Sequence, residues 1–271
     1  MRLWLASFDD GGERRCGLAS IRRDDGREVL AAVATDVLGE LASLPTRVRV
    51  GQWLDVQAEL LVDASAAKVV VLGPRGAPRS IPTSLSARRV VARFAADREG
   101  PWLVQILATV NGGPRQILEA LVFAGVEPET AYTATPVPGE ALAEGVADPR
   151  AALERMLNGA RSSEGRAQLE RMPELDVVAQ RHADAMRDAG RIAHDLGGGD
   201  PNMRVAEQGL RVRGAYENVA HGRDAQSAHR ALWRSPSHRE NLLQPSFDAV
   251  GIGVAHGDDG SVWVCELFAD F

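Results

Sequence analysis

The hydrophobic pattern changes its period partway along this chain of 271 residues. Up to about residue 125, apolar and polar residues alternate in short runs, of which Trp53 to Leu60 is the clearest. Such alternation is typical of half-buried strands, because successive side chains point to opposite faces of a sheet. From residue 148 onward, apolar residues recur every three or four positions, as on one face of a helix. We therefore expect a β part followed by a part that contains helices.

The β part contains several further runs of this kind, separated by turn-forming residues. The runs cover residues 17–22, 28–35, 68–72, 90–94, 102–108 and 116–123. The first two flank Asp24-Asp25-Gly26, a strong hairpin signal. Strands at this spacing, without helices between them, predict an immunoglobulin-like β-sandwich over residues 1–125, although other all-β architectures fit the same pattern. Residues 126–147 are rich in Pro, Thr, Glu and Gly and are predicted to be a linker.

Residues 148–271 are predicted to be mixed α and β. Asp148-Pro149 is a helix start, and it is followed by an apolar face from Ala152 to Ala160. Pro173 opens a second helix, whose apolar stripe includes His182, and Asp224 caps a third. Two strands, 250–255 and 262–268, close the chain around a turn.

Composition excludes several classes of protein. The net charge of −6 gives no electrostatic reason to expect nucleic acid as a partner. No apolar run reaches the roughly 18–20 residues that a membrane-spanning helix needs. The first residues are not a signal peptide, and because the sequence opens inside a predicted strand, we expect a further segment before it in the natural protein. Cys16 and Cys265 are too few for a disulfide framework and are expected to be free thiols.

Several motifs of the second part, taken in order, resemble one known family. Residues 157–161 resemble an N-x-x-R element, and 178–186 read VAQRHADAM, similar to A-x-x-H-[SA]-x-D-M. Residues 217–220 match E-N-[IV]-A, and 233–243 read WRSPSHRENLL, which resembles W-x-x-S-P-x-H-R-x-N-[IL]-L and fits it from Ser235 onward, with one residue fewer after the tryptophan. Residues 250–254 and 263–268 complete the series. This part of the chain, roughly 148–270, resembles the bacterial branch of the CAP superfamily, named for cysteine-rich secretory, antigen 5 and pathogenesis-related proteins.

The resemblance implies a three-layer α/β/α sandwich over residues 148–271. It also implies that His194, Glu217 and His238 converge on one solvent-filled cleft, which in some members binds a divalent metal. Two imidazoles and one carboxylate suit Zn²⁺. The sequence departs from the family at Tyr216, where glycine is usual. It also lacks the second cavity glutamate of eukaryotic members, because Ser235-Pro236 stands there.

One local pattern supports a neutral His238. Ser237 and Glu240 are spaced as a capping box, which would put His238 in the first turn of a helix, where the helix dipole disfavours an imidazolium. A neutral imidazole suits a metal ligand or a general base. The alternative is that Glu217 and His238 only hydrogen-bond each other to hold the cleft walls together.

Several other polar residues suit either the cleft or a structural role. As further cleft-lining candidates we take His182, Tyr216, Asn218 and Glu266, with a core role favoured for His182. His221 and His229 are within reach of the cleft or of solvent, and we expect both to face solvent. His256 is also expected to face solvent, and Cys265 to pack in the core. Gly197 to Asp200 is predicted to be a mobile loop beside His194, because it lacks the strand and lysine of a phosphate loop.

The sequence thus predicts a secreted or envelope-associated protein that is extracellular or periplasmic. We expect it to bind a ligand in the His/Glu/His cleft, with zinc as a candidate cofactor. Two alternatives stay open: a metal-dependent hydrolase of an extracellular substrate, with Glu217 as its general base, and a carrier of an apolar molecule. Whether the protein is an enzyme is left open, because the missing second glutamate weakens that case. The expected partner is an extracellular small molecule, a lipid or a component of the cell envelope.

Overall fold

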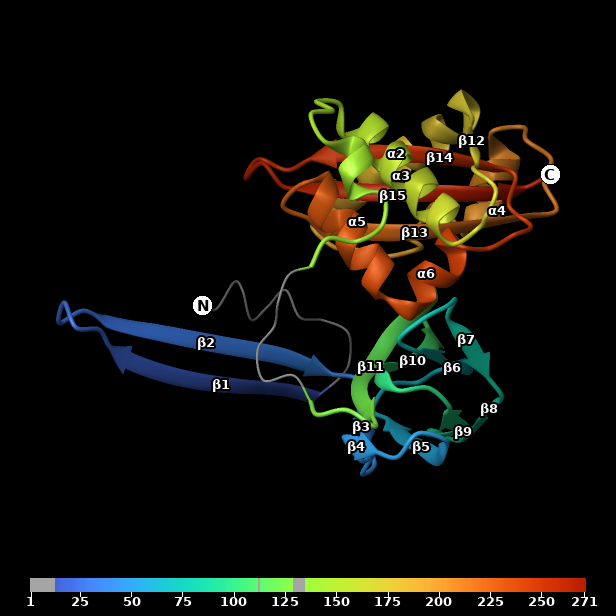
Figure 1. The fold of residues 1–271 in the computed structure, drawn as a ribbon. Coiled ribbons are helices and arrows are strands. Elements are labelled where there is room, and N and C mark those ends of the chain that lie inside the picture. Colours follow the sequence, from blue (N-terminus) through green and yellow to red (C-terminus); the bar gives the residue numbers. More distant parts are fainter. Residues whose placement is uncertain (1–12, 112, 129–134) are drawn as a thin grey trace.

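The computed structural model describes residues 13–111, 113–128 and 135–271 (Figure 1). The opening residues on which the signal-peptide argument rests lie outside these ranges, as do residues 129–134 of the predicted linker. The chain forms a β-rich region of several sheets, followed by a mixed α/β region.

The β-rich region consists of a hairpin and two larger sheets. Strands β1 (Glu13–Arg22) and β2 (Glu28–Val37) form the hairpin, which projects away from the rest of the molecule (Figure 1). One larger sheet has the order β3-β5-β9-β8 and the other the order β4-β11-β10-β6-β7. Their strands are β3 (Gly39–Leu41), β4 (Arg47–Val48), β5 (Gln52–Leu60), β6 (Ala66–Leu72), β7 (Arg79–Ile81), β8 (Thr83–Ser86), β9 (Arg89–Ala96), β10 (Gly100–Val110) and β11 (Gly113–Ala124).

The two larger sheets share one apolar core. On β5 every second side chain from Leu54 to Leu60 is buried, and β9 shows the same alternation from Val90 to Ala96. These side chains pack against Val69, Val71 and the buried face of β10, whose Trp102 stands 5.9 Å from Phe94 between ring centroids. The predicted strands are present, but strands β4 and β11 pair in parallel. An immunoglobulin-like topology stays a prediction.

The second region is built around a four-stranded sheet with the order β12-β14-β15-β13. Helices cover both of its faces (Figure 1). The elements are a 3-10 turn η1 (Glu140–Ala143), α2 (Pro149–Ser163), β12 (Glu170–Arg171), α3 (Pro173–Ala189), α4 (Pro201–Glu207), β13 (Gly214–Gly222), α5 (Ala225–Arg234), α6 (Pro236–Leu242), β14 (Ala249–His256) and β15 (Val262–Asp270).

Two separate cores lie on the two sides of this sheet. Helices α2, α5 and α6 pack with Ile252, Val264 and Phe268 on one side. Helix α3 packs with Cys265 and Leu267 on the other. The helix starts predicted at Asp148 and Asp224 are confirmed, because both side chains accept a hydrogen bond from the first turn.

Helix α3 lies directly on strand β14 because that strand has glycine at two positions facing the helix. A Cβ atom added to Gly251 would stand 2.2 Å from the Leu175 carbonyl carbon, and one added to Gly253 would stand 2.2 Å from the Ala179 carbonyl oxygen. Both distances are far below van der Waals contact. The two glycines therefore permit the close approach of helix and sheet.

The boundaries 1–125, 126–147 and 148–271 stay a prediction. The residues at the end of the predicted linker pack on the second region: Val137 belongs to its core, and buried Glu140 pairs with Arg230 through two hydrogen bonds of 2.6 Å. Limited proteolysis would show where the chain between the two regions is cut first.

Candidate functional site

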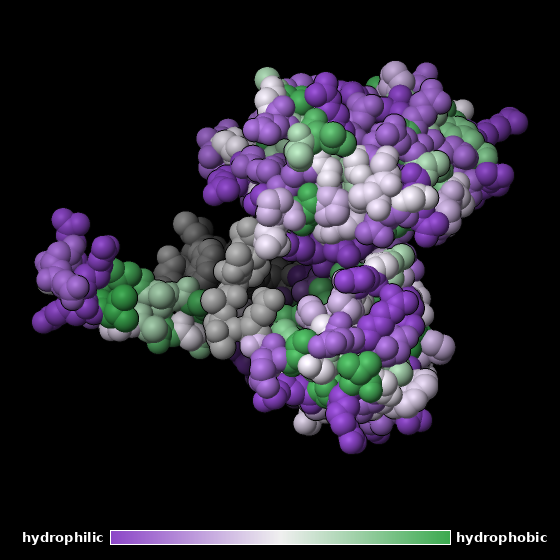
Figure 2. All heavy atoms as spheres, viewed as in Figure 1, coloured by the Kyte–Doolittle hydropathy of each residue, from purple (hydrophilic) through white to green (hydrophobic). Residues whose placement is uncertain are grey.

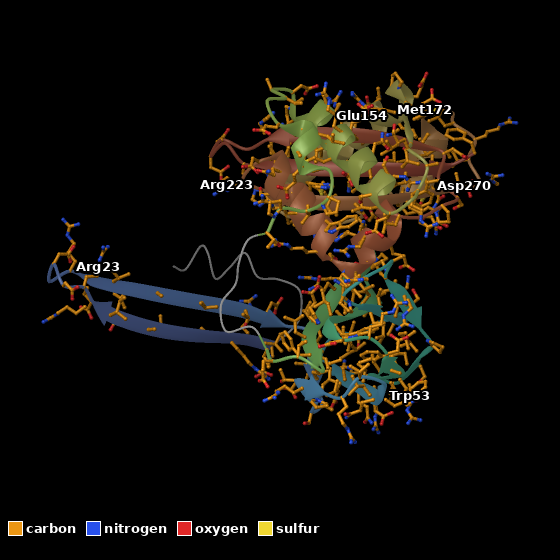
Figure 3. The ribbon with its side chains drawn as sticks, viewed as in Figure 1. Arg23, Trp53, Glu154, Met172, Arg223 and Asp270 are labelled. Carbon is orange, nitrogen blue, oxygen red and sulfur yellow. The ribbon has the colours of Figure 1, made fainter. Side chains whose placement is uncertain are left out.

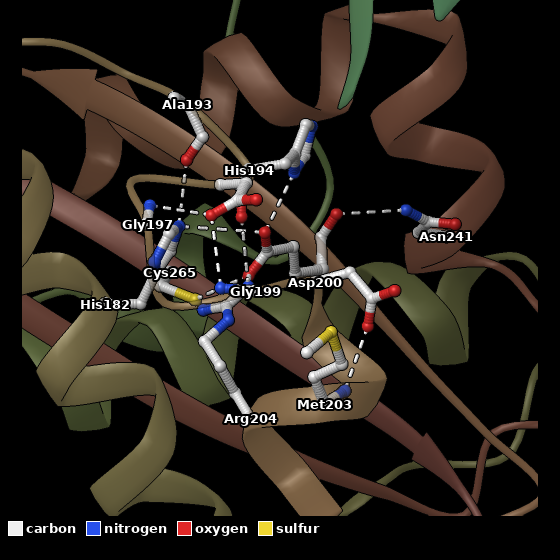
Figure 4. Close-up of polar contacts among 12 residues, drawn as sticks. His182, Ala193, His194, Gly197, Gly199, Asp200, Met203, Arg204, Asn241 and Cys265 are labelled. Atoms are coloured by element: carbon white, nitrogen blue, oxygen red, sulfur yellow. Dashed lines mark hydrogen bonds and ion pairs between the residues drawn. The ribbon is translucent and has the colours of Figure 1, made fainter. Parts of the chain in front are cut away.

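Glu217 lies at the centre of a buried polar cluster on strand β13. Its Oε1 accepts a hydrogen bond from Nδ1 of His194 at 2.9 Å, and its Oε2 accepts one from Nη2 of Arg204 at 2.7 Å (Figure 4). The residue is only 5% exposed. Burial raises the pKa of Glu217, but the His194 hydrogen bond and the charge of Arg204 outweigh it and hold the pKa below its ordinary value. Glu217 is therefore a carboxylate at neutral pH.

Arg204 positions two of these groups at once. Besides Glu217, it donates to the backbone carbonyl of His194 at 3.3 Å, so that it fixes the loop from which the imidazole projects. The loop is held a second time by Asp195, whose carboxylate accepts from the amides of Gly197 and Gly199. Sequence reasoning missed Arg204, because nothing distinguishes it from the other arginines of this arginine-rich chain.

His182 and Cys265 lie behind Glu217. The Nε2 of His182 donates to the Ala193 carbonyl at 2.9 Å and stands 3.7 Å from Glu217 Oε1. Burial lowers the pKa of His182, and burial raises the pKa of the Cys265 thiol, whose Sγ is 3.5 Å from Glu217 Oε2. Both cysteines are free, as predicted, with Cys16 exposed and Cys265 buried.

His238 lies on α6. It lines the cleft described below, whereas His182 is buried behind the cleft wall. The side chain of Asn218 donates to the His238 carbonyl at 3.1 Å and accepts from Asn241 at 3.0 Å. Burial, together with nearby His194, lowers the pKa of His238 to about 4. The imidazole of His238 is therefore neutral at pH 7, as the sequence suggested.

The predicted capping box on this helix is wrong. Helix α6 begins at Pro236 with Ser235 as its N-cap, which places Ser237 inside the helix. Glu240 instead accepts from Lys68 Nζ at 2.6 Å and from Ser80 at 2.9 Å, both in the β-rich region. The free amide of Ser237 donates to the side chain of Gln105 at 3.0 Å. The helix is thus capped by another part of the chain.

His194, Glu217 and His238 line one cleft of about 600 Å³ between the two regions. Tyr216 lines it as well and is half exposed. The remaining lining residues are Ala66, Ala67, Lys68, Leu107, Ala108, Thr109, Gly113, Pro114 and Gln116 from the β-rich region, and Asp195, Asp200, Pro201, Asn202, Ala215, Ser237, Glu240 and Asn241 from the second. The other lining candidates, His182, Asn218 and Glu266, lie buried behind the wall.

Gln105 joins the two walls of the cleft. Its side chain is fully buried, and its Nε2 donates to Gln116 at 2.9 Å, to Glu119 at 2.9 Å and to Ser235 at 3.1 Å. With the bond from Ser237, both ends of the amide are engaged. The β-rich region therefore holds the helix that carries His238.

The arrangement of donors does not assemble the predicted zinc ligand set. Both oxygens of Glu217 are engaged, one of them by the guanidinium of Arg204, whose charge opposes a second cation. Across the described ranges, no group of three or more His, Cys, Asp or Glu side chains is placed to hold a metal ion. Zinc binding by His194, Glu217 and His238 stays a prediction.

The remaining histidines divide between solvent and core. His221 and His256 are exposed, as expected. The expectation for His229 is wrong, since it is fully buried and its Nε2 bonds the Pro138 carbonyl at 3.0 Å. Its position on the inner face of α5, three residues before Leu232, was the available signal.

Residues 154–267 match the model of the cysteine-rich secretory protein family, and this part of the chain is a CAP domain, as its motifs predicted. No curated protein matches the chain. In the part of the chain that the structure describes, no helix has the length and apolar character needed to cross a bilayer.

The solved structures that match this chain include three bacterial proteins. An outer surface protein from Borrelia burgdorferi is 23% identical over 46% of this chain and 93% of its own, with a TM-score of 0.44. An extracellular SCP-domain protein from Bacillus anthracis is 15% identical over 86% of this chain and 89% of its own, with a TM-score of 0.42. A cysteine-rich secretory protein from Staphylococcus aureus is 11% identical over 86% of each chain, with a TM-score of 0.40.

Proposed function

We propose that this protein acts outside the cytoplasm, secreted or attached to the cell envelope, and binds a ligand in the cleft between its CAP domain and its β-rich region. The observation that carries this proposal is the cleft itself, about 600 Å³ in volume, with His194, Glu217 and His238 on one wall and the β-rich region forming the other. Its volume lies in the range of small-molecule sites.

The chemistry of the walls favours a ligand rich in hydrogen-bonding groups. Amides line the cleft at Gln116, Asn202 and Asn241, and the exposed ring of Tyr216 offers a flat apolar surface beside them. Hydroxyl, carboxylate and imidazole groups surround the same space. We therefore propose a saccharide–peptide fragment of the cell envelope as the ligand class, ahead of an apolar cargo.

The hydrolase alternative finds no support in this geometry. A general base needs a free proton acceptor within reach of its substrate. Both oxygens of Glu217 already accept hydrogen bonds, and the residue is buried. We therefore propose binding as the function.

Calorimetric titration with soluble disaccharide-peptide fragments of peptidoglycan tests the proposal. We expect saturable binding that weakens about tenfold or more, a loss of about 1.4 kcal/mol, in His238→Ala and in Lys68→Ala, one variant from each wall. His256→Ala, at the exposed end of β14, is the matched control and should bind as the wild type does. Binding of a fatty acid instead, or binding equal in all three variants, would contradict the proposal.

A parallel titration with Zn²⁺ tests the cofactor prediction. If His194 and His238 bind zinc, the heat of binding should disappear in His194→Ala and diminish as the pH falls, because protons compete for imidazole nitrogens. Absence of heat near neutral pH in the wild type would rule out the zinc site while leaving the ligand proposal standing.

A further inference from the structure

The hairpin β1–β2 exposes apolar side chains that nothing in the described chain covers. Leu18 is 72% exposed, Leu30 73%, Ile21 65% and Val33 61%. Figure 2 shows this hydrophobic surface along the arm, between the body and the hydrophilic tip. Isolated two-stranded hairpins are marginally stable in water, and exposed strand edges invite pairing. An arm of this kind therefore needs a partner.

The register of the hairpin divides these side chains between two faces. Arg14 pairs with Asp36, Leu18 with Ala32, and Arg22 with Glu28, and because side chains alternate, these residues share one face. The same face also carries Cys16, Ser20, Leu30 and Ala34. Ile21, Val29 and Val33 lie on the other face. The Cys16 face thus has an apolar centre and an exposed charged pair, Arg22 and Glu28, at its tip, whereas the carboxylate oxygens of Asp36 at its base are buried.

This face is complementary to itself at the exposed tip of the arm. There strand β1 supplies Arg22 and β2 supplies Glu28. A two-fold axis along the arm would lay β1 of one copy over β2 of another. Arg22 of each copy would then face Glu28 of the other.

The side chains of the apolar centre are also complementary to those of a second copy. Under this two-fold axis Leu18 would lie over Ala32 of the second copy, and Leu30 over its Ser20. Large side chains would thus meet small ones, which is the condition for two sheets to interdigitate. The tip of the arm does not favour a strongly charged partner, because its charges balance. It contains three arginines, at positions 22, 23 and 27, and three acids, at positions 24, 25 and 28. Arg23 is labelled in Figure 3.

We propose that the Cys16 face of the β1–β2 hairpin is a dimerisation surface whose partner is the same face of a second copy of this chain. Ten residues per strand at about 3.3 Å give an arm about 33 Å long, so two faces roughly 10 Å wide bury roughly 700 Å² in total. This is less than the roughly 1,200 Å² of stable complexes. The dimer is therefore reversible and forms in a concentration-dependent manner.

Sedimentation velocity over a range of micromolar concentrations tests this dimer. We expect a monomer–dimer equilibrium in the wild type that is weakened about tenfold or more in Leu18→Ser/Leu30→Ser. The matched control is Ile21→Ser/Val33→Ser, which removes equally exposed side chains from the opposite face and should dimerise as the wild type does. Unchanged thermal melts in both variants would show that the body remains folded.

A charge exchange tests the orientation of the two arms. Arg22→Glu should weaken the dimer by placing two acids opposite each other, and Arg22→Glu/Glu28→Arg should restore it. Cys16 reports the same contact: a short bismaleimide should link two wild-type chains, and Cys16→Ser should abolish the link, because Cys265 is buried.

Three results would overturn the proposal. These are a wild type that stays monomeric at all concentrations, serine variants of both faces that behave alike, and a charge exchange that fails to restore the dimer. If the wild type binds anionic lipid vesicles and Leu18→Ser/Leu30→Ser does not, while neither dimerises, the partner is a membrane and the proposal is wrong.

Discussion

The CAP domain and the β-rich region bury different kinds of side chain. In the CAP domain and the segment that packs on it, the buried polar groups of the described chain are Glu140, Arg161, Asp176, His182, Glu217, Asn218, His229, Ser261 and Glu266. In the described part of the β-rich region, Gln105 is the single polar side chain of this class, and it faces the CAP domain. Burying a polar group is costly unless it is hydrogen-bonded. Polar burial is thus concentrated in the CAP domain, and in the described β-rich region it is found at the joint between the regions.

The difference suggests that the two regions respond to substitution in different ways. Replacing one side chain of the β-rich core removes apolar contacts, whereas replacing one buried polar group of the CAP domain leaves its partners without hydrogen bonds. The predictions below test this difference, from the largest expected effect to the smallest.

Arg161 should be the most sensitive of these positions. It is fully buried and donates to three backbone carbonyls, those of Ala167, Leu242 and Gln244, at 2.6 to 3.1 Å. Arg161→Ala should lower the free energy of unfolding by about 4 kcal/mol, because it empties a packed volume and leaves three acceptors unpaired. Urea denaturation measures this loss, with exposed Arg155→Ala as the control. A loss below about 1 kcal/mol would break the comparison.

Glu217→Gln should cost about 3 kcal/mol at pH 7, because the charge of buried Arg204 then lacks its partner. The wild-type advantage should also depend on pH. The pKa of Glu217 is lowered, so its contribution is complete above the ordinary carboxyl value of about 4.3 and is lost as the pH falls through the lowered value. Thermal melts of both proteins from pH 7 to pH 3 should therefore converge. Parallel curves would contradict the assigned charge state.

Gln105→Leu should cost about 2 kcal/mol, the largest effect of any polar substitution in the β-rich region, because Ser237 loses its acceptor and Glu119 loses its donor. Hydrogen exchange of the first turn of α6 should quicken in the same variant. Gln57→Leu, on half-buried β5 away from the joint, is the control and should leave α6 unchanged. Equal exchange in both variants would show that the joint does not hold the helix.

Glu266→Gln should change stability least at low pH and should show the opposite pH dependence to Glu217. Burial raises the pKa of Glu266 to about 8. Wild-type stability should therefore fall relative to the variant as the pH rises from about 4 toward 8, because the folded protein keeps a proton that the unfolded chain has released, while the amide does not titrate. Denaturation at pH 5 and pH 7.5 measures the slope. A variant that loses stability relative to the wild type as the pH rises would refute the raised pKa.

The sequence predicted local features better than long-range ones. The predicted helix starts at Asp148, Pro173 and Asp224 are confirmed, because capping and proline placement act within one turn. The hairpin turn at Asp24-Asp25-Gly26 is confirmed as well, and Gly26 has the positive φ of 82° that such a turn requires. The strand β13 was missed because its buried polar residues, Glu217 and Asn218, hide the alternation that marks a strand.

The candidate site required information from outside the local pattern. Family resemblance placed His194, Glu217 and His238 together, and all three line one cleft. Nothing in the sequence could assign Arg204 to Glu217 or Gln105 to Ser237, because these pairs are 13 and 132 positions apart and depend on how layers and regions pack. The capping box failed for the same reason: Glu240 is paired with Lys68, a residue of the other region.

The glycines of β14 have an effect beyond their own strand. Gly251 and Gly253 set the thickness of the sandwich on the α3 side, since any side chain there would force the helix outward. His194 follows the end of α3 by only five residues. A side chain on β14 that displaced the helix would therefore also move the imidazole away from Glu217. The distance between α3 and the sheet thus helps to set the position of His194 at the cleft. Through this distance, the two glycines of β14 maintain a hydrogen bond to Glu217 on β13.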